Sequence, residues 1–134
     1  MGEISAGFEG LDLDNPERTL VDGFTSFLGA VAASPDVYRL IFFQEGGGNA
    51  AVAERIHAGR EAQVQALATL ARGWLERHNP GRDDINRLSV LLGQVLVGLA
   101  EAGARSVLAE TDPWSPEEAG AMLGKLAARS AAEV

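Results

Sequence analysis

Apolar residues recur at intervals of three and four along most of the chain, which is the spacing of one face of an α-helix. No stretch shows the sustained alternation of apolar and polar residues that is typical of a half-buried strand. The apolar pattern divides into five segments, and a residue suited to a helix N-terminus opens each of them. We therefore predict an all-α fold, a helical bundle of about five helices joined by short loops.

The first two segments open alike, with a capping residue, a proline and an acid. Asn15-Pro16-Glu17 begins the first, and Ser34-Pro35-Asp36 begins the second. The polar residue caps the helix, proline suits the first helical position, and the acid complements the helix dipole. We expect the second helix to run as far as the three glycines at 46–48, which disfavour further helix.

Three further helices follow. The third is expected over about 50–77 with Asn49 as its cap, and the fourth from Asp83 or Asp84 to about 109. The fifth begins at Ser115, which has capping-box spacing to Glu118. The paired acids at 83–84 and 117–118 are interpreted as helix starts, because adjacent residues do not share a helix face.

Two stretches lie outside this helical pattern. Residues 1–14 hold four acids, three glycines and no base, so we expect an acidic N-terminal arm ahead of one domain over 15–134. The arm is expected to be flexible or partly docked. The glycines at 46–48 predict a mobile connection, and a second interpretation makes them a hinge or a pocket entrance.

The fourth segment is the most informative, because it is uncharged from 88 to 100 and apolar on nearly every side. Such a helix must be buried all round. Either it lies at the centre of one subunit, or one of its faces packs on a second subunit, and we favour a homodimer. The expected interface combines small and apolar residues of the last two helices: Gly93, Val97, Ala100, Ala104, Met122 and Leu126.

Composition narrows the classes of function. The chain has 134 residues, enough for one domain with a core, and a formal charge of −8. That charge argues against contact with nucleic acid or an anionic membrane. The uncharged run of 88–100 is too short to span a bilayer, and the N-terminus lacks the features of a secretory signal. We therefore expect a cytoplasmic protein.

Little in the sequence points to catalysis or to a metal. There is no cysteine, and no serine lies in a nucleophile elbow. Glu54 and His57 have the spacing of one di-iron ligand pair, but no second pair accompanies them. His78 follows the third segment and is expected to interact with the helix dipole. We therefore predict no catalytic residues, no metal and no cofactor.

Four stretches occur in a fixed order. They are SPDVYRLIFFQE at 34–45, a long helix ending at Trp74-Leu75, LLGQVLVGLA at 91–100, and DPWSPEE at 112–118. Over roughly residues 15–130 this order resembles the C-terminal domain of TetR-family transcriptional regulators. The resemblance implies a small-molecule pocket and a four-helix interface between subunits. Residues 1–14 lack the helices and basic face of a helix-turn-helix, so DNA binding would need an upstream domain absent from this chain.

A pocket needs an apolar lining and a few polar groups that orient the ligand. We expect these residues on the inward faces of the first four helices, with Gln94 as the best polar candidate and Tyr38 and His57 as weaker ones. The alternative that the same aromatic residues simply form the hydrophobic core stays open. The candidate pocket residues are Phe24, Phe27, Phe42, Phe43, Leu67, Trp74, Leu92 and Gln94.

These expectations combine into one hypothesis. The chain is the effector-binding and dimerisation domain of a TetR-like regulator that senses a small apolar or amphipathic molecule. The alternative is a structural or protein-interaction helical bundle without such a ligand.

Overall fold

The computed structural model describes residues 15–44 and 49–134, and within these ranges it contains helices and no strand. The expected all-α bundle is confirmed, and the described ranges hold five α-helices and one π-helical turn. In chain order the elements are α2 (Pro16–Ala33), α3 (Pro35–Arg39), η1 (Leu40–Gln44), α4 (Ala50–His78), α5 (Ile85–Val107) and α6 (Pro116–Ala132). The expectations for residues 1–14 and 46–48 lie outside the described residues.

Three of the expected caps are confirmed in detail. The side chain of Asn15 accepts a hydrogen bond from the backbone N–H of Arg18, and Asn49 accepts from two backbone N–H groups of α4. Ser115 accepts from the backbone N–H of Glu118 at 3.1 Å, which is the expected spacing. These side chains satisfy backbone donors that the helix itself leaves unpaired.

The starts of α3 and α5 differ from these three, because the expected cap Ser34 makes no capping hydrogen bond with its side chain and neither does Asp84. The carboxylate of Asp84 instead accepts from the guanidinium of Arg82, which holds the pKa of Asp84 below its ordinary value. Arg82 also donates to the backbone carbonyl of Val134 at 2.9 Å, so it joins the α4–α5 loop to the end of α6.

The prediction of one regular second helix is wrong. It is α-helical for only five residues, and the backbone widens into the π-helical turn η1 at Leu40. Tyr38 and Phe42 stack at 6.1 Å between ring centroids, and each meets Phe27 edge-on. This aromatic packing against α2 coincides with the irregular turn and keeps both Tyr38 and Phe42 buried.

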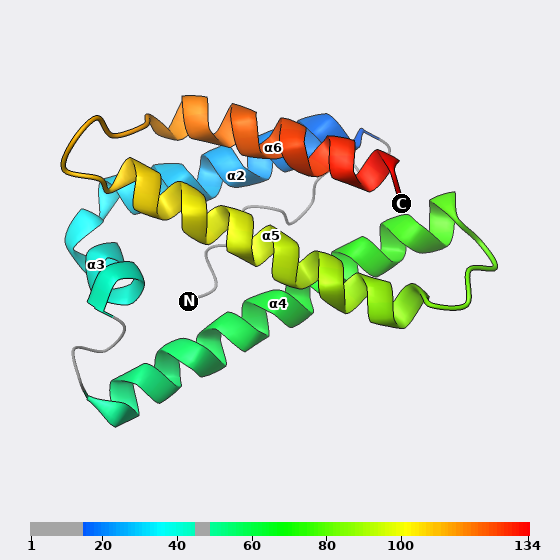
Figure 1. Cartoon of the computed structure of the whole chain (residues 1–134), viewed down its shortest axis with the longest axis horizontal. Helices are drawn as coiled ribbons and strands as arrows, with labels where there is room; N and C mark the ends of the chain where they lie inside the picture. Colours follow the sequence, from blue (N-terminus) through cyan, green and yellow to red (C-terminus); the bar gives the residue numbers. More distant parts are fainter. Residues whose placement is uncertain (1–14, 45–48) are drawn as a thin grey trace.

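The helices form two antiparallel pairs, α2 with α6 and α4 with α5, and α5 crosses between the pairs (Figure 1). In each pair, a glycine allows the two helices to approach closely. A Cβ atom on Gly124 would lie 2.5 Å from Val21 Cα, and one on Gly93 would lie 2.5 Å from the carbonyl oxygen of Val64. The crossings therefore depend on residues that have no side chain.

The core lies where α2, α5 and α6 meet the second half of α4. Phe24, Phe27 and Leu28 of α2 are almost fully buried in it, together with Val64 and Leu67 of α4. The first half of α4 extends away from this core (Figure 1), and its side chains from 50 to 62 are exposed or only partly buried.

The expected dimer interface is largely wrong. Gly93, Val97, Ala100 and Ala104 are buried inside the single chain, because their small side chains let α4, α2 and α6 approach α5 closely. Two further interface candidates, Met122 and Leu126 of α6, are about half exposed, at 50% and 48%.

The apolar character of α5 extends beyond the uncharged run counted in the sequence. Among the described helices, α5 is the one that is long and apolar enough to cross a membrane by length and composition, with a mean hydropathy of 1.3. A single helix of this kind is weak evidence for a membrane-spanning segment, because a core helix of a soluble protein passes the same test.

Candidate functional site

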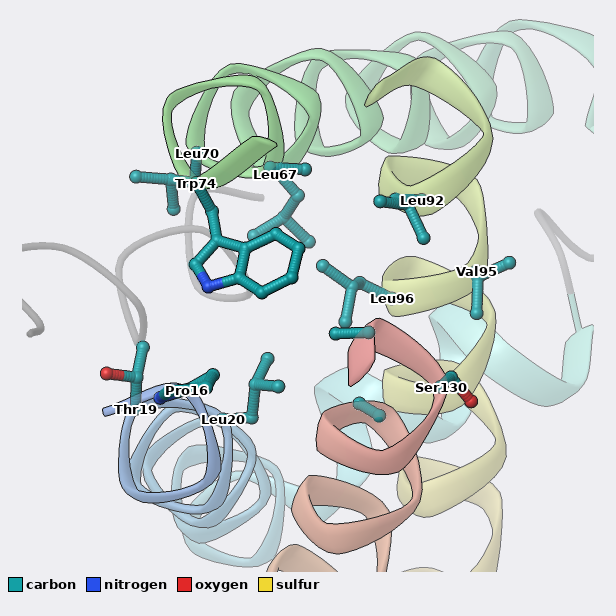
Figure 2. Close-up of a pocket in the computed structure, with 13 residues that line it drawn as sticks. Pro16, Thr19, Leu20, Leu67, Leu70, Trp74, Leu92, Val95, Leu96 and Ser130 are labelled. Atoms are coloured by element: carbon teal, nitrogen blue, oxygen red, sulfur yellow. The ribbon is translucent and has the colours of Figure 1, made fainter. Parts of the chain in front are cut away.

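An apolar pocket of about 100 Å³ opens between the two helix pairs. Figure 2 shows that the first turn of α2, the C-terminal half of α4, the middle of α5 and the end of α6 surround it. The lining residues are Pro16, Thr19, Leu20, Leu67, Leu70, Ala71, Trp74, Leu92, Val95, Leu96, Ala127, Ser130 and Ala131.

The walls of the pocket are almost entirely hydrocarbon. None of the described residues that line it is charged, and its only hydroxyl groups belong to Thr19 and Ser130. Ser130 Oγ donates to the carbonyl of Leu126 at 3.0 Å, so this hydroxyl is paired within its own helix. Val95 is 43% exposed and Ser130 is also exposed, so the pocket opens to solvent beside them.

Trp74 is the one aromatic residue among the described residues that line the pocket. Its indole projects from α4 toward α2 and α5 (Figure 2). Among the described residues, its Nε1 atom is the one buried side-chain nitrogen or oxygen without a hydrogen-bond partner. Leaving a buried donor unpaired costs about 1–3 kcal/mol, and native proteins contain few such groups.

His78 packs on the indole. The two rings stack at 4.6 Å between centroids with an interplanar angle of 18°. His78 Nδ1 lies 2.9 Å from the carbonyl oxygen of Trp74, within hydrogen-bond distance. The expected interaction of His78 with the end of its helix is therefore present, and it also covers one face of Trp74.

The predicted pocket residues divide into three groups. Leu67, Trp74 and Leu92 do line the pocket. Phe24, Phe27 and Phe42 do not; they belong to the buried core, further along α2 and in η1. Leu67 belongs both to the buried core and to the pocket lining.

Phe43 and Gln94 form the third group, and both expectations are wrong. Phe43 is 53% exposed at η1, and Gln94 is exposed on α5, although it lies within an apolar run. Gln94 does not line the pocket, so the structure does not place its amide to orient a ligand there. Of the weaker candidates, Tyr38 lies in the core and His57 lies on the exposed part of α4.

Sequence reasoning missed most of the lining at the ends of the helices. Pro16, Thr19 and Leu20 come from the first turn and a half of α2, and Ala127, Ser130 and Ala131 come from the last turns of α6. Small residues on an alanine-rich helix carry no signal for a pocket. The pairing of α2 with α6 brings the start of the one beside the end of the other.

The charged groups lie away from this pocket. Arg60 of α4 donates to Glu101 of α5 through Nε and Nη2 at 2.9 and 3.1 Å, and this bidentate pair raises the pKa of Arg60. In the described part of the chain, no group of three or more His, Asp or Glu side chains is placed to hold a metal ion. The pocket therefore offers an apolar binding surface.

Comparison of the chain with family models, with curated proteins and with solved structures finds no match.

Proposed function

We propose that this chain is an effector-binding and dimerisation domain of the kind found in TetR-like transcriptional regulators. Its ligand is a small apolar or amphipathic molecule, and its place of action is the cytoplasm. Contact with DNA would be made by an upstream domain that is absent from this chain. The observation that carries the proposal is the apolar pocket between the two helix pairs.

The position of the pocket supports a sensing role. Residues from four helices line it, so a bound molecule contacts both helix pairs at once. Its lining includes Pro16 and Leu20 at the start of α2, the end through which any upstream domain would be attached. A ligand changes the relation between the pairs only if it binds one arrangement more tightly than another.

Dimerisation is proposed through the part of the expected interface that stays exposed, Met122 and Leu126, extended by two exposed residues of α5. Large apolar side chains are exposed on α5 and α6, namely Leu91 at 54%, Val95 at 43%, Met122 at 50% and Leu126 at 48%. Exposed apolar residues on neighbouring helices are typical of a protein interface. The two helices that the TetR resemblance assigns to the dimer therefore keep a surface for a partner.

A thermal-shift screen of small apolar compounds tests the proposal, with a variant that fills the pocket. Ala71→Phe places a ring among the lining residues, whereas Ala58→Phe makes the same change at an exposed position of α4. We expect saturable stabilisation of the native chain and of Ala58→Phe, by about 2.7 kcal/mol at a ligand concentration of one hundred times Kd. Ala71→Phe should respond weakly or not at all.

The second candidate is an interaction bundle without a small-molecule ligand, and the exposed apolar side chains of α5 and α6 favour it. The same screen separates the two. Stabilisation that does not saturate, or that is equal in Ala71→Phe, would reject the ligand-binding proposal and leave the interaction bundle.

A further inference from the structure

The mouth of the pocket, beside Val95 and Ser130, lies at the edge of the exposed apolar face of α5 and α6. Both residues line the pocket, both are exposed, and they lie on the same side of it (Figure 2). Leu91 precedes Val95 by one helical turn, and Leu126 precedes Ser130 by one turn. Leu91 and Leu126 are about half exposed. The mouth therefore continues into the side chains through which dimerisation is proposed.

The exposed face of α6 carries opposite charges at its two ends. Glu118, Met122 and Leu126 follow one another at intervals of four, and Arg129 comes three residues later. Side chains at these intervals share one face of a helix. All four are exposed, and neither charged residue forms an ion pair with another described residue. This face of α6 thus presents an acid, two apolar side chains and a base in sequence.

Such a face is complementary to a second copy of itself that runs in the opposite direction. An antiparallel pair of α6 helices that places Met122 against Leu126 of the partner subunit also places Glu118 against Arg129 of the partner subunit. Twofold symmetry repeats both contacts. Opposite charges that face one another across a contact fix its register and select the partner. The partner that this face fits is therefore a second copy of this chain.

The same register brings the partner subunit to the mouth of the pocket. Ser130 directly follows Arg129, so it lies beside the turn of α6 that meets Glu118 of the partner subunit. The first turn of the partner's α6 therefore approaches the opening between Val95 and Ser130. The described helices of one chain leave this side of the pocket open to solvent.

The volume of the pocket limits how much of a ligand one chain can enclose. An engineered apolar cavity of about 150 Å³ in another protein holds benzene, which has six carbon atoms. The pocket here has a volume of about 100 Å³, which in the same ratio holds about four carbon atoms. A longer amphipathic molecule therefore extends through the mouth, to the place where the partner subunit lies.

We propose that a second copy of this chain closes the mouth of the pocket, so that the ligand and the partner subunit strengthen each other's binding. This inference rests on the proposed ligand-binding function and specifies how that site is completed. The part of the ligand beyond the mouth is removed from water only in the dimer, so the dimer binds the ligand more tightly. Because such coupling is reciprocal, the ligand also stabilises the dimer.

A charge exchange on α6 tests the partner and its register. Glu118→Arg or Arg129→Glu alone places like charges opposite each other and should raise the dissociation constant of the dimer about tenfold. The double variant Glu118→Arg/Arg129→Glu should restore dimerisation. Glu117→Arg changes the same charge in the same turn of α6, at an exposed position on another face, and should leave the dimer unchanged. Sedimentation velocity across a dilution series measures all four variants.

Two alkanols of different length test the closure of the mouth. 1-Butanol has four carbon atoms and fits inside the pocket, whereas 1-octanol extends through the mouth. At saturation, fixed by thermal shift, 1-octanol should strengthen the dimer of the native chain about tenfold, the effect of burying roughly two further methylene groups. 1-Butanol should have little effect.

Two variants complete this measurement. Ala71→Phe fills the pocket and should abolish the effect of 1-octanol, which separates binding in the pocket from general solvent effects. If the native dimer is too tight to dissociate, the same series is carried out on Met122→Ala, which removes part of the apolar contact.

The outcomes separate this inference from the function on which it rests. Bound 1-octanol that leaves the dissociation constant of the dimer unchanged overturns the inference, and so does a chain that stays monomeric with 1-octanol bound. A double charge variant that stays dissociated also overturns it, as does rejection of 1-octanol while other apolar compounds bind in the screen. Absence of saturable binding by every compound contradicts the proposed function itself.

Discussion

Single glycines decide how closely the helices of this molecule approach one another. On α5, Gly93 lies directly against the backbone of α4, where a Cβ atom would be 2.5 Å from the Val64 carbonyl oxygen and 3.0 Å from the Ala68 nitrogen. Gly98, five residues further along the same helix, has no atom within 4 Å of that position. Close packing on α4 therefore requires a glycine at 93 but not at 98, although both belong to the same apolar run.

This difference gives a matched pair of substitutions. Gly93→Ala should lower the free energy of unfolding by about 1–3 kcal/mol, because backbone atoms of α4 cannot move aside as a flexible side chain would. Gly98→Ala should leave stability unchanged or raise it by up to about 1 kcal/mol, since alanine has the higher helix propensity. Urea denaturation of both variants checks the prediction. Equal loss of stability at both positions would contradict the packing described for α4 and α5.

At the scale of elements, α4 consists of two halves with different surroundings. Its second half carries the buried residues Val64, Leu67 and Leu75, whereas its first half, up to Ala62, has no buried residue. The ion pair between Arg60 and Glu101 lies near the boundary. The continuous helical pattern over 50–77 predicts one helix but does not reveal this division, because both halves carry apolar residues at helical spacing.

The division predicts uneven hydrogen exchange along one helix. Amides at 53–60 should exchange faster than amides at 64–75, because the first half has little packing to oppose local opening. Hydrogen–deuterium exchange measured by mass spectrometry at native pH checks this. Equal protection of both halves would show that a partner or another part of the chain covers the first half.

The local rules of helix formation account for most element boundaries. The helix starts at Pro16, Ala50 and Pro116 follow capping residues that the sequence identifies, and all three caps make their hydrogen bonds. The exceptions arise from interactions beyond the local sequence. Asp84 is engaged by Arg82 instead of the helix, and the aromatic packing around Phe42 accompanies a π-helical turn.

At the scale of the whole molecule, the open question is what covers the exposed apolar side chains of α5 and α6. We predict that light scattering after size exclusion gives a mass near twice the 14.1 kDa of one chain. Leu91→Glu or Leu126→Glu should shift the protein toward the monomer, because burying a carboxylate in an apolar contact is strongly unfavourable.

A control substitution on another surface sharpens this measurement. Val37 of α3 is 58% exposed, so Val37→Glu makes a comparable change away from α5 and α6 and should leave the mass unchanged. A monomeric native chain, or a dimer that only Val37→Glu dissociates, would contradict the proposed interface.

The sequence by itself determined the helical class and most of the helix starts in the part of the chain that the structure describes, because capping and apolar spacing act within a few residues. It also identified Leu67, Trp74 and Leu92, which line the pocket. It did not separate the two faces of α5. Glycine, alanine and valine look the same in a sequence whether they meet their own chain or a second subunit.

Only the tertiary structure decided that Gly93, Val97, Ala100 and Ala104 pack inside one chain. It also brought the first turn and a half of α2 beside the end of α6 and left the indole nitrogen of Trp74 buried, with no hydrogen-bond partner among the described residues. The physical reason is that a pocket is the space left where several helices cross. Its shape depends on the distances between the helices. Small residues that lie far apart in the sequence set these distances.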